Sequence, residues 1–290
     1  MTAVLLGIAA ALSWGLADFA ARFTGRAVGP VVATLAMLTT SAAALGLFIL
    51  WHGAAIDWRW ASLPLPALSG LGIAAATLLL YYGLATGPMT VVSPIAGSYP
   101  ALVVGFEVLA GLRPSPIQWL AMAATLLGAI AVARAGGRFS EPGGFAPDAV
   151  RRATLAAIGA SAMFALGVVA GQQSVPAHGE FGALFLSRIV SALLLFALVA
   201  ARRERPAMPW RWLPLLTVQG LLDGGAYLAL FAGSAGDGAA IVAVVSSGFG
   251  VVTTLLGRVF LGERVGAAQW GGIALVFGGV AVLSGAGPER

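Results

Sequence analysis

Long apolar stretches separated by short polar ones make up nearly the whole chain. A helix needs about 20 mostly apolar residues to cross the hydrocarbon core of a membrane. By this criterion the pattern predicts ten membrane-spanning helices. The predicted spans are Ala3–Arg22, Val31–Trp51, Leu65–Thr86, Met89–Gly111, Pro116–Ala135, Ala153–Gln173, Phe181–Ala201, Leu213–Ala232, Ala239–Leu261 and Ala267–Gly285.

The composition supports a membrane protein, because 59 % of the residues are hydrophobic and 9 % are charged. Soluble domains carry about 25 % charged residues, and a soluble fold of this size must present much of its surface to water. We therefore predict an all-α integral membrane protein. The absence of cysteine excludes disulfides and thiolate metal sites.

The longest polar stretch lies near the middle of the chain, at residues 136–152, and is rich in glycine, proline and charge. Such a composition is typical of a linker. It separates five predicted spans in residues 1–135 from five in residues 153–290. Because five is an odd number, the second set must enter the membrane from the opposite side.

A short sequence occurs once in each set. Residues 111–119 read GLRPSPIQW and residues 262–270 read GERVGAAQW, an offset of 151 residues. Each copy connects the fourth span of its set to the fifth. The repeat predicts two inverted five-helix units, an arrangement that commonly builds transporters with a site at the interface of the units. We expect a central cavity there.

The arginines predict an orientation, because cytoplasmic loops carry an excess of basic residues. Three arginines, Arg59, Arg113 and Arg290, lie on one predicted side, and Arg188 lies inside a span. Twelve lie on the other side, which we expect to be cytoplasmic: Arg22, Arg26, Arg134, Arg138, Arg151, Arg152, Arg202, Arg203, Arg205, Arg211, Arg258 and Arg264. Both termini are then predicted outside the cytoplasm of a cell with this protein in its inner (plasma) membrane.

The chain resembles ten-span, EamA-type members of the drug/metabolite transporter superfamily over nearly its whole length. The resemblance rests on short motifs, their order and their duplication. These motifs are Trp14-Gly15, Tyr82-Gly83-Leu84-Ala85, Pro94, Tyr99-Pro100, Phe260-Leu261-Gly262-Glu263-Arg264, Gln269 and Gly272. The chain departs from the pattern at Leu112, which takes the place of an acidic residue in the first copy of the turn.

The resemblance implies a fold and an activity. The family is similar to exporters of amino acids and other small metabolites. Related branches of the superfamily transport nucleotide sugars or triose phosphates. In such a fold the first four spans of each unit surround the cavity, and the fifth and tenth spans brace the outside. First-span carboxylates serve coupling in small multidrug relatives, which leaves a proton role open for Asp18.

Charged residues inside the spans are the first candidates for function, because a charge near the membrane centre costs about 2.5–3.5 kcal/mol. Asp223 lies in the middle of the eighth span and Arg188 within the seventh. Asp223 either contacts a solute amine or carries a proton, or it forms a structural pair with Arg188; both can hold together, since an Asp and an Arg facing one cavity suit a zwitterion. Asp18 lies four residues before Arg22, a spacing at which the two side chains form an ion pair on one helix face.

Aromatic and hydroxyl side chains in the spans are the second candidates. Rings stack on apolar solutes and bind cations, and hydroxyls near glycine offer hydrogen bonds; packing between helices is the alternative. Pro94 and Pro100 predict a bent fourth span that lines the cavity. The candidates are Trp14, Tyr82, Ser93, Tyr99, Phe164, Tyr227, Ser246 and Ser247.

The sequence predicts a secondary transporter that exports small amphipathic metabolites such as aromatic or hydrophobic amino acids by alternating access. A multidrug or organic-cation exporter is the main alternative. An intramembrane enzyme is a weaker one, because His52 and His178 are expected in loops and no catalytic, metal or phosphate-binding motif occurs.

The expected partners follow from this function. They are the lipid bilayer and a small solute, with protons left open as the coupling ion. No cofactor is predicted, and no nucleic-acid partner, since no basic patch interleaves with aromatic residues. A monomer is compatible with the sequence, which leaves the oligomeric state open.

Overall fold

The computed structural model describes residues 2–53, 60–109, 115–135, 145–201, 208–234 and 238–285. All regular structure in these residues is helical, which confirms the all-α prediction. The helices are α1 (Thr2–Val28), α2 (Pro30–His52), α3 (Pro64–Thr86), α4 (Met89–Ala96), α5 (Tyr99–Leu109), α6 (Pro116–Ala135), α7 (Pro147–Ala201), η2 (Trp210–Trp212), α8 (Leu213–Ala232), α9 (Gly238–Ser247), α10 (Phe249–Leu261) and α11 (Ala267–Gly285).

Eight helical segments of the described chain are long and apolar enough to cross a membrane, and residues 267–282 of α11 form a shorter apolar helix. These segments confirm an integral membrane protein. The number of ten spans and the inverted repeat stay predictions. The long helix α7 contains the sixth and seventh predicted spans and changes direction at Gly179, whose φ of 65° is the left-handed conformation that glycine tolerates.

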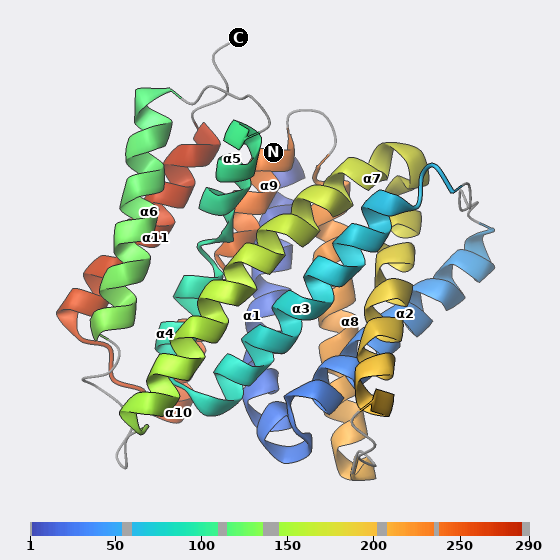
Figure 1. Ribbon diagram of the computed structural model, residues 1–290, viewed down its shortest axis with the longest axis horizontal. Coiled ribbons are helices and arrows are strands. Elements are labelled where there is room, and N and C mark those ends of the chain that lie inside the picture. Colours follow the sequence, from blue (N-terminus) through green and yellow to red (C-terminus); the bar gives the residue numbers. More distant parts are fainter. Residues whose placement is uncertain are drawn as a thin grey trace.

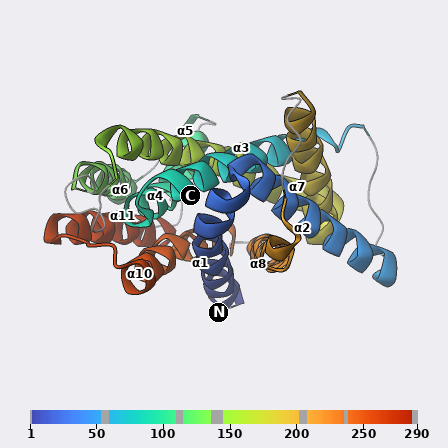
Figure 2. The ribbon, with the colours of Figure 1, turned by 90° about the horizontal axis from the view of Figure 1, so that it is seen from below.

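The helices surround a centre crossed by α1 (Figure 1). Seen from below, α10 and α11 lie on one side of α1 and α8 lies on the other, and α3 and the first part of α7 lie above them in the view (Figure 2). At the lower end in Figure 1, α1, α3, α6 and α10 end and α7 and α8 begin. We call this the arginine-rich end. The predicted basic loops join these helix ends.

Close packing of glycines joins α6 to α11 at one edge of the molecule (Figure 1). A Cβ atom added to Gly128 of α6 would lie 2.6 Å from the carbonyl oxygen of Gly272 in α11. A Cβ added to Gly279 would lie 2.6 Å from the carbonyl oxygen of Ala121. Small residues allow membrane helices to approach this closely.

The fourth predicted span is broken where its prolines predict a bend. Pro94 has no N–H to donate to the carbonyl of Thr90 in the preceding turn. The Nε2 amide of Gln269 donates to that carbonyl instead, at 2.8 Å. The helix then ends at Ala96, and α5 begins at Tyr99. A backbone group freed within the membrane is thus satisfied by a neighbouring element.

Two expectations from the sequence can be compared with the helices, and the division into two units with a linker stays a prediction. Helix α7 begins at Pro147 and therefore includes the last part of the predicted linker; residues 136–144 lie outside the described chain. The two histidines, expected in loops, are helical: His52 ends α2 and His178 lies in α7. His178 is buried, and its Nε2 donates to the carbonyl of Ser62 at 2.9 Å.

Candidate functional site

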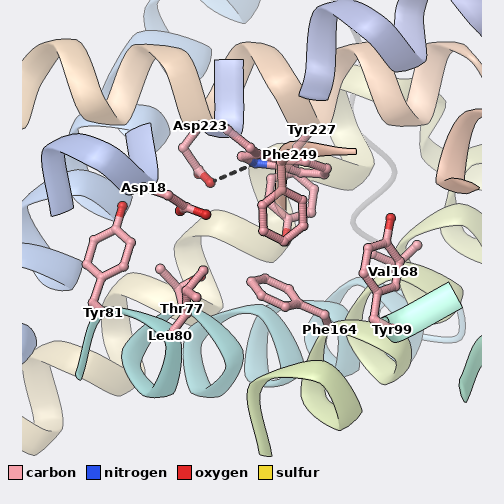
Figure 3. Close-up of a pocket in the computed structure, with 11 residues that line it drawn as sticks. Asp18, Thr77, Leu80, Tyr81, Tyr99, Phe164, Val168, Asp223, Tyr227 and Phe249 are labelled. Carbon is pink, nitrogen blue, oxygen red and sulfur yellow. Dashed lines mark hydrogen bonds between the residues drawn. The ribbon is translucent and has the colours of Figure 1, made fainter. Parts of the chain in front are cut away.

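A partly enclosed pocket lies between α1, α3, α5, α7, α8 and α10 (Figure 3). Its empty space is about 370 Å³, which includes its open side. Within it, about 20 Å³ can hold the centre of a water molecule, so the pocket has room for about one water in this conformation and must widen to take a solute. The lining residues are Trp14, Asp18, Thr77, Leu80, Tyr81, Tyr99, Phe164, Val168, Asp223, Tyr227 and Phe249.

Helical spacing explains why so few segments supply this lining. Side chains four residues apart lie one above the other on a helix. Trp14 and Asp18 are related in this way on α1, as are Phe164 and Val168 on α7, and Asp223 and Tyr227 on α8. Each helix therefore contributes a short column of side chains to the pocket wall.

An ion pair lies at one wall of the pocket. Arg188 donates from Nη2 to Asp223 Oδ2, and both side chains are almost completely buried. Trp14 Nε1 donates to the other carboxylate oxygen of Asp223 at 3.2 Å (Figure 3). The guanidinium also lies over the Tyr227 ring, 4.5 Å from its centroid. Both carboxylate oxygens are thus used, and the ring stabilises the cation.

The pair leaves donors unused on the arginine. Within the described residues, Nε and Nη1 of Arg188 make no hydrogen bond, and neither does the hydroxyl of Tyr227. A buried polar group without a partner is costly. The Tyr227 hydroxyl belongs to the pocket wall, whereas Arg188 contacts Asp223 and Tyr227 without lining the pocket itself.

Asp18 faces the same space from α1 (Figure 3). It is 4 % exposed, and its Oδ2 has no hydrogen-bond partner among the described residues. The expected ion pair with Arg22 does not form in this structure. Arg22 instead donates from Nη1 to the backbone carbonyls of Leu84, at 2.7 Å, and Gly87. Those free carbonyls at the end of α3 attract the guanidinium away from Asp18.

Four aromatic rings make a continuous apolar wall beside the charges. The centroid of Trp14 lies 4.8 Å from that of Tyr227 and 5.9 Å from that of Phe249, in edge-to-face geometry. Phe164 lies 6.5 Å from Phe249. Edge-to-face contacts hold such rings in fixed positions. The pocket thus combines a polar side with an aromatic side.

Two broken helices cross beside the pocket. Helices α4 and α5 are separated at Gly97-Ser98, and α9 and α10 at Gly248. A Cβ added to Gly97 would lie 3.0 Å from the Ser247 carbonyl oxygen, and one added to Gly250 would lie 2.7 Å from that of Ser93. Glycine at both positions therefore permits the crossing. Tyr99 and Phe249, which follow the breaks, line the pocket.

The serine candidates lie at this crossing and not in the pocket wall. Ser246 is 3.2 Å from the hydroxyl of Tyr99, which also donates to the carbonyl of Ala243 at 2.9 Å. Ser247 donates within its own helix, to Val244 at 2.7 Å. The Ser93 hydroxyl is buried without a hydrogen bond to the described chain. Ser246 thus orients a wall residue, and Ser93 and Ser247 lie behind the wall.

Comparison with known proteins assigns the family. A sequence profile of the EamA-like transporter family matches residues 1–134 and 151–285. The chain belongs to the EamA-like transporter family. A solved crystal structure of a protein with 25 % sequence identity has the same fold, with a TM-score of 0.68 over 97 % of this chain and 95 % of that one. The comparison with curated proteins found no match.

The EamA-like fold brings together most, but not all, of the candidates. Trp14, Asp18, Tyr99, Phe164, Asp223 and Tyr227 line one pocket, and Arg188 is paired at its wall. Tyr82 is absent from the lining, and the adjacent Tyr81 takes part instead. Two neighbouring tyrosines point about 100° apart on a helix, so their order in the sequence does not tell which one faces inward.

Four further wall residues were not predicted: Thr77, Leu80, Val168 and Phe249. Thr77 and Val168 lie one turn from Tyr81 and Phe164 respectively, so helical spacing provides a signal for them. Phe249 follows the glycine of the Ser246-Ser247-Gly248 motif. No group of His, Asp or Glu side chains suited to hold a metal ion occurs in the part of the chain that the structure describes.

Proposed function

We propose that this EamA-like transporter exports small zwitterionic metabolites with an apolar or aromatic side chain, such as amino acids. The observation that supports this most strongly is the arrangement of the pocket. Asp18 has an unpartnered carboxylate oxygen in the pocket wall, and Arg188, which contacts the wall residues Asp223 and Tyr227, has two unused donor nitrogens. An ammonium group suits the first and a carboxylate suits the second. The aromatic wall beside them suits an apolar side chain.

The number of charges argues against phosphorylated solutes. Such a solute brings about two negative charges and favours several arginines or lysines. Around this pocket the described chain offers Arg188, which already compensates Asp223. The carboxylate of Asp18 adds a further negative charge to the same space. A doubly charged anion would therefore meet net repulsion.

An organic-cation exporter is the second candidate, and Asp18 favours it. Two carboxylates and several rings in one pocket attract a cation. The paired Arg188 distinguishes the two proposals, because a cation has no use for its free donors, whereas a carboxylate does. Exchange of the solute ammonium for a proton on Asp18 would couple either kind of export to a proton gradient.

We further propose transport by alternating access between two inverted five-helix units. The support is the 151-residue repeat in the sequence and the reciprocal crossing at Gly97 and Gly250. Broken helices at the centre of a repeat interface are typical of rocking transporters. The arginine-rich end would face the cytoplasm of a cell whose inner membrane contains the protein.

Transport by the purified protein in liposomes tests the proposal. Counterflow of apolar zwitterionic amino acids, quaternary ammonium cations and phosphorylated sugars is compared in the same vesicles. We expect zwitterion transport, and a loss of about tenfold or more in Asp18→Asn, since a hydrogen bond to a charged group contributes about 1.5–3 kcal/mol. Asp148→Asn removes a carboxylate that is 78 % exposed, and is the matched control.

Each outcome separates the alternatives. Faster transport of quaternary ammonium cations than of any zwitterion would support the second candidate. Transport of the phosphorylated sugar would contradict both. Asp18→Asn is a cleaner test than Asp223→Asn, because loss of the Asp223 charge leaves Arg188 buried without its counter-ion, and such a change destabilises the fold.

A further inference from the structure

Arg22 is deeply buried although it belongs to the arginine-rich end. It is 1 % exposed, whereas Arg26, one turn later on α1, is exposed to solvent. The carbonyls of Leu84 and Gly87 that it binds belong to the end of α3 and to the turn before α4. Arg22 therefore fastens α1 to the α3–α4 turn.

Glu263 extends this contact to a third segment. Its carboxylate accepts the backbone N–H groups of Met89, at 2.9 Å, and Thr90, at 2.8 Å, at the start of α4. One oxygen lies 3.9 Å from Nη2 of Arg22. Glu263 follows Gly262, which ends α10 in the left-handed conformation. The α10–α11 turn is thus tied to α4 and to α1 through buried charges.

A fourth segment covers the guanidinium. The ring of Phe145, just before α7, lies 5.0 Å from the Cζ atom of Arg22. Contacts from α1, the α3–α4 turn, the α10–α11 turn and the segment before α7 therefore meet at one side chain. Any motion that opens the arginine-rich end must separate some of these segments and remove Arg22 from its partners.

Asp18 is an alternative partner for Arg22. The two residues are four apart on α1, where an Asp and an Arg form an ion pair on one face. In the present structure Asp18 faces the pocket with an unpartnered oxygen, and Arg22 binds the other segments. The other charges near Asp18 are Asp223 and Arg188, which compensate each other.

We propose that Arg22 is a latch that exchanges partners during transport, an inference that rests on the proposed function. When the arginine-rich end is closed, Arg22 binds Leu84, Gly87 and Glu263. When that end opens, Arg22 turns to Asp18 and the two charges compensate each other, while Glu263 keeps the backbone N–H groups of Met89 and Thr90. A solute ammonium that binds Asp18 displaces Arg22, which returns to the latch and closes the end behind the solute.

The breaks in the central helices allow such an opening. Helices α4 and α10 lie on the arginine-rich side of Gly97 and Gly248, and α5 and α9 lie on the other side. Glu263 ties the start of α4 to the end of α10. Once Arg22 is released, α4 and α10 can move together about the two glycines.

Thiol labelling tests the latch without any solute, because the chain contains no cysteine. Thr77→Cys places a thiol in the pocket wall, and a membrane-impermeant thiol reagent is applied to the arginine-rich side of proteoliposomes. Arg22→Met should accelerate labelling by about tenfold or more, since each hydrogen bond to a charged group contributes about 1.5–3 kcal/mol. Arg151→Met removes an arginine of the same end whose side chain is 72 % exposed and pairs with Asp148, and should leave the rate unchanged.

Asp18→Asn should act in the opposite direction. It removes the partner that Arg22 has in the open state and so should slow labelling about two- to fivefold, the range expected for a partly hydrated ion pair. In an Arg22→Met background the same substitution should have no effect, because the residues act through each other. An undiminished effect of Asp18→Asn in that background would overturn the proposal.

Unchanged labelling in a folded Arg22→Met protein, with normal labelling from the opposite side, would also overturn it. If Arg22→Met fails to fold, Arg22→Lys replaces it; a lysine keeps the charge but lacks the fork that reaches several acceptors. It should give an intermediate acceleration, and the wild-type rate would overturn the latch. A responsive latch in a protein that transports no zwitterion would refute the solute assignment alone.

Discussion

The glutamine that the two copies of the repeated sequence share has a different hydrogen-bond partner in each copy. In the first copy, at the start of α6, the side-chain oxygen of Gln118 accepts the backbone N–H of Ser115 at 2.9 Å. The hydroxyl of Ser115 in turn accepts the backbone N–H of Gln118 at 3.4 Å. This is a capping box. In the second copy, Gly266 replaces the serine at the start of α11, and Gln269 reaches across to the Thr90 carbonyl of α4.

The comparison separates the contacts of residues that the two copies share from those of residues that differ between them. The repeat places a glutamine at the third position of both helices. The residue before the helix determines whether that glutamine hydrogen-bonds to the start of its own helix or to another helix. The first copy has Leu112 and Ser115 where the second has Glu263 and Gly266, and in the second copy Glu263 and Gln269 bind α4. Residues 110–114 of the first copy lie outside the described chain.

The largest effect is expected from Glu263→Ala. It leaves the N–H groups of Met89 and Thr90 without their acceptor and Arg22 without its nearby carboxylate. Removing one partner of a buried charged pair costs about 3–5 kcal/mol, and denaturant unfolding in detergent measures it. Asp148→Ala, in an exposed pair, should stay within about 1 kcal/mol. Equal losses would contradict the role of the second copy.

Gln269→Leu should cost about 1–3 kcal/mol, because the Thr90 carbonyl loses its donor inside the membrane. Pro94→Ala restores an N–H to the helix at the position that can bind this carbonyl. The loss from Gln269→Leu should therefore shrink in the Pro94→Ala background. Additive losses in the double variant would show that Gln269 does not compensate for the proline.

The helix crossing offers a graded comparison between the two halves. A Cβ atom at Gly250 would lie 2.7 Å from a backbone oxygen, one at Gly97 would lie 3.0 Å from one, and one at Gly105 has no neighbour within 4 Å. Overpacking of this kind costs about 1–3 kcal/mol. Transport rates in liposomes should fall most for Gly250→Ala, less for Gly97→Ala and little for Gly105→Ala. Any other order would argue against a tight crossing.

The smallest effect is expected where the first copy is made like the second. Ser115→Gly removes the side chain of the capping box, and glycine at such a position costs only a few tenths of a kcal/mol. The unfolding midpoint should barely move, and transport should stay the same. A loss of stability as large as that of Gln269→Leu would mean that the two copies contribute equally to the stability of the fold.

Much of the fold follows from the sequence because the membrane imposes a simple length rule. Apolar runs locate the helices, and Pro94 and Pro100 locate the break in the fourth span. Side-chain charges inside the spans point to Asp223 and Arg188, which the structure brings together. These features depend on residue type alone.

The remaining features depend on directions that apolar helices do not reveal. A helix that is apolar all round gives no signal for which face is inward, so Tyr81 and Tyr82 are equivalent in the sequence. Phe249 resembles any packing residue until the break at Gly248 turns it toward the pocket. The partners of Arg22 are backbone carbonyls, and every residue has one. The i,i+4 pair with Asp18 was therefore the natural expectation.

Labelling of a single thiol from both sides of the membrane tests the central claim most directly. Thr77 is 3 % exposed and its hydroxyl makes no hydrogen bond in the described chain, so Thr77→Cys is a mild change. We expect reagent from either side of the membrane to reach this thiol, one side at a time, and a transported zwitterion to protect the thiol from both. Labelling that a saturating solute leaves unchanged would contradict a solute site in this pocket.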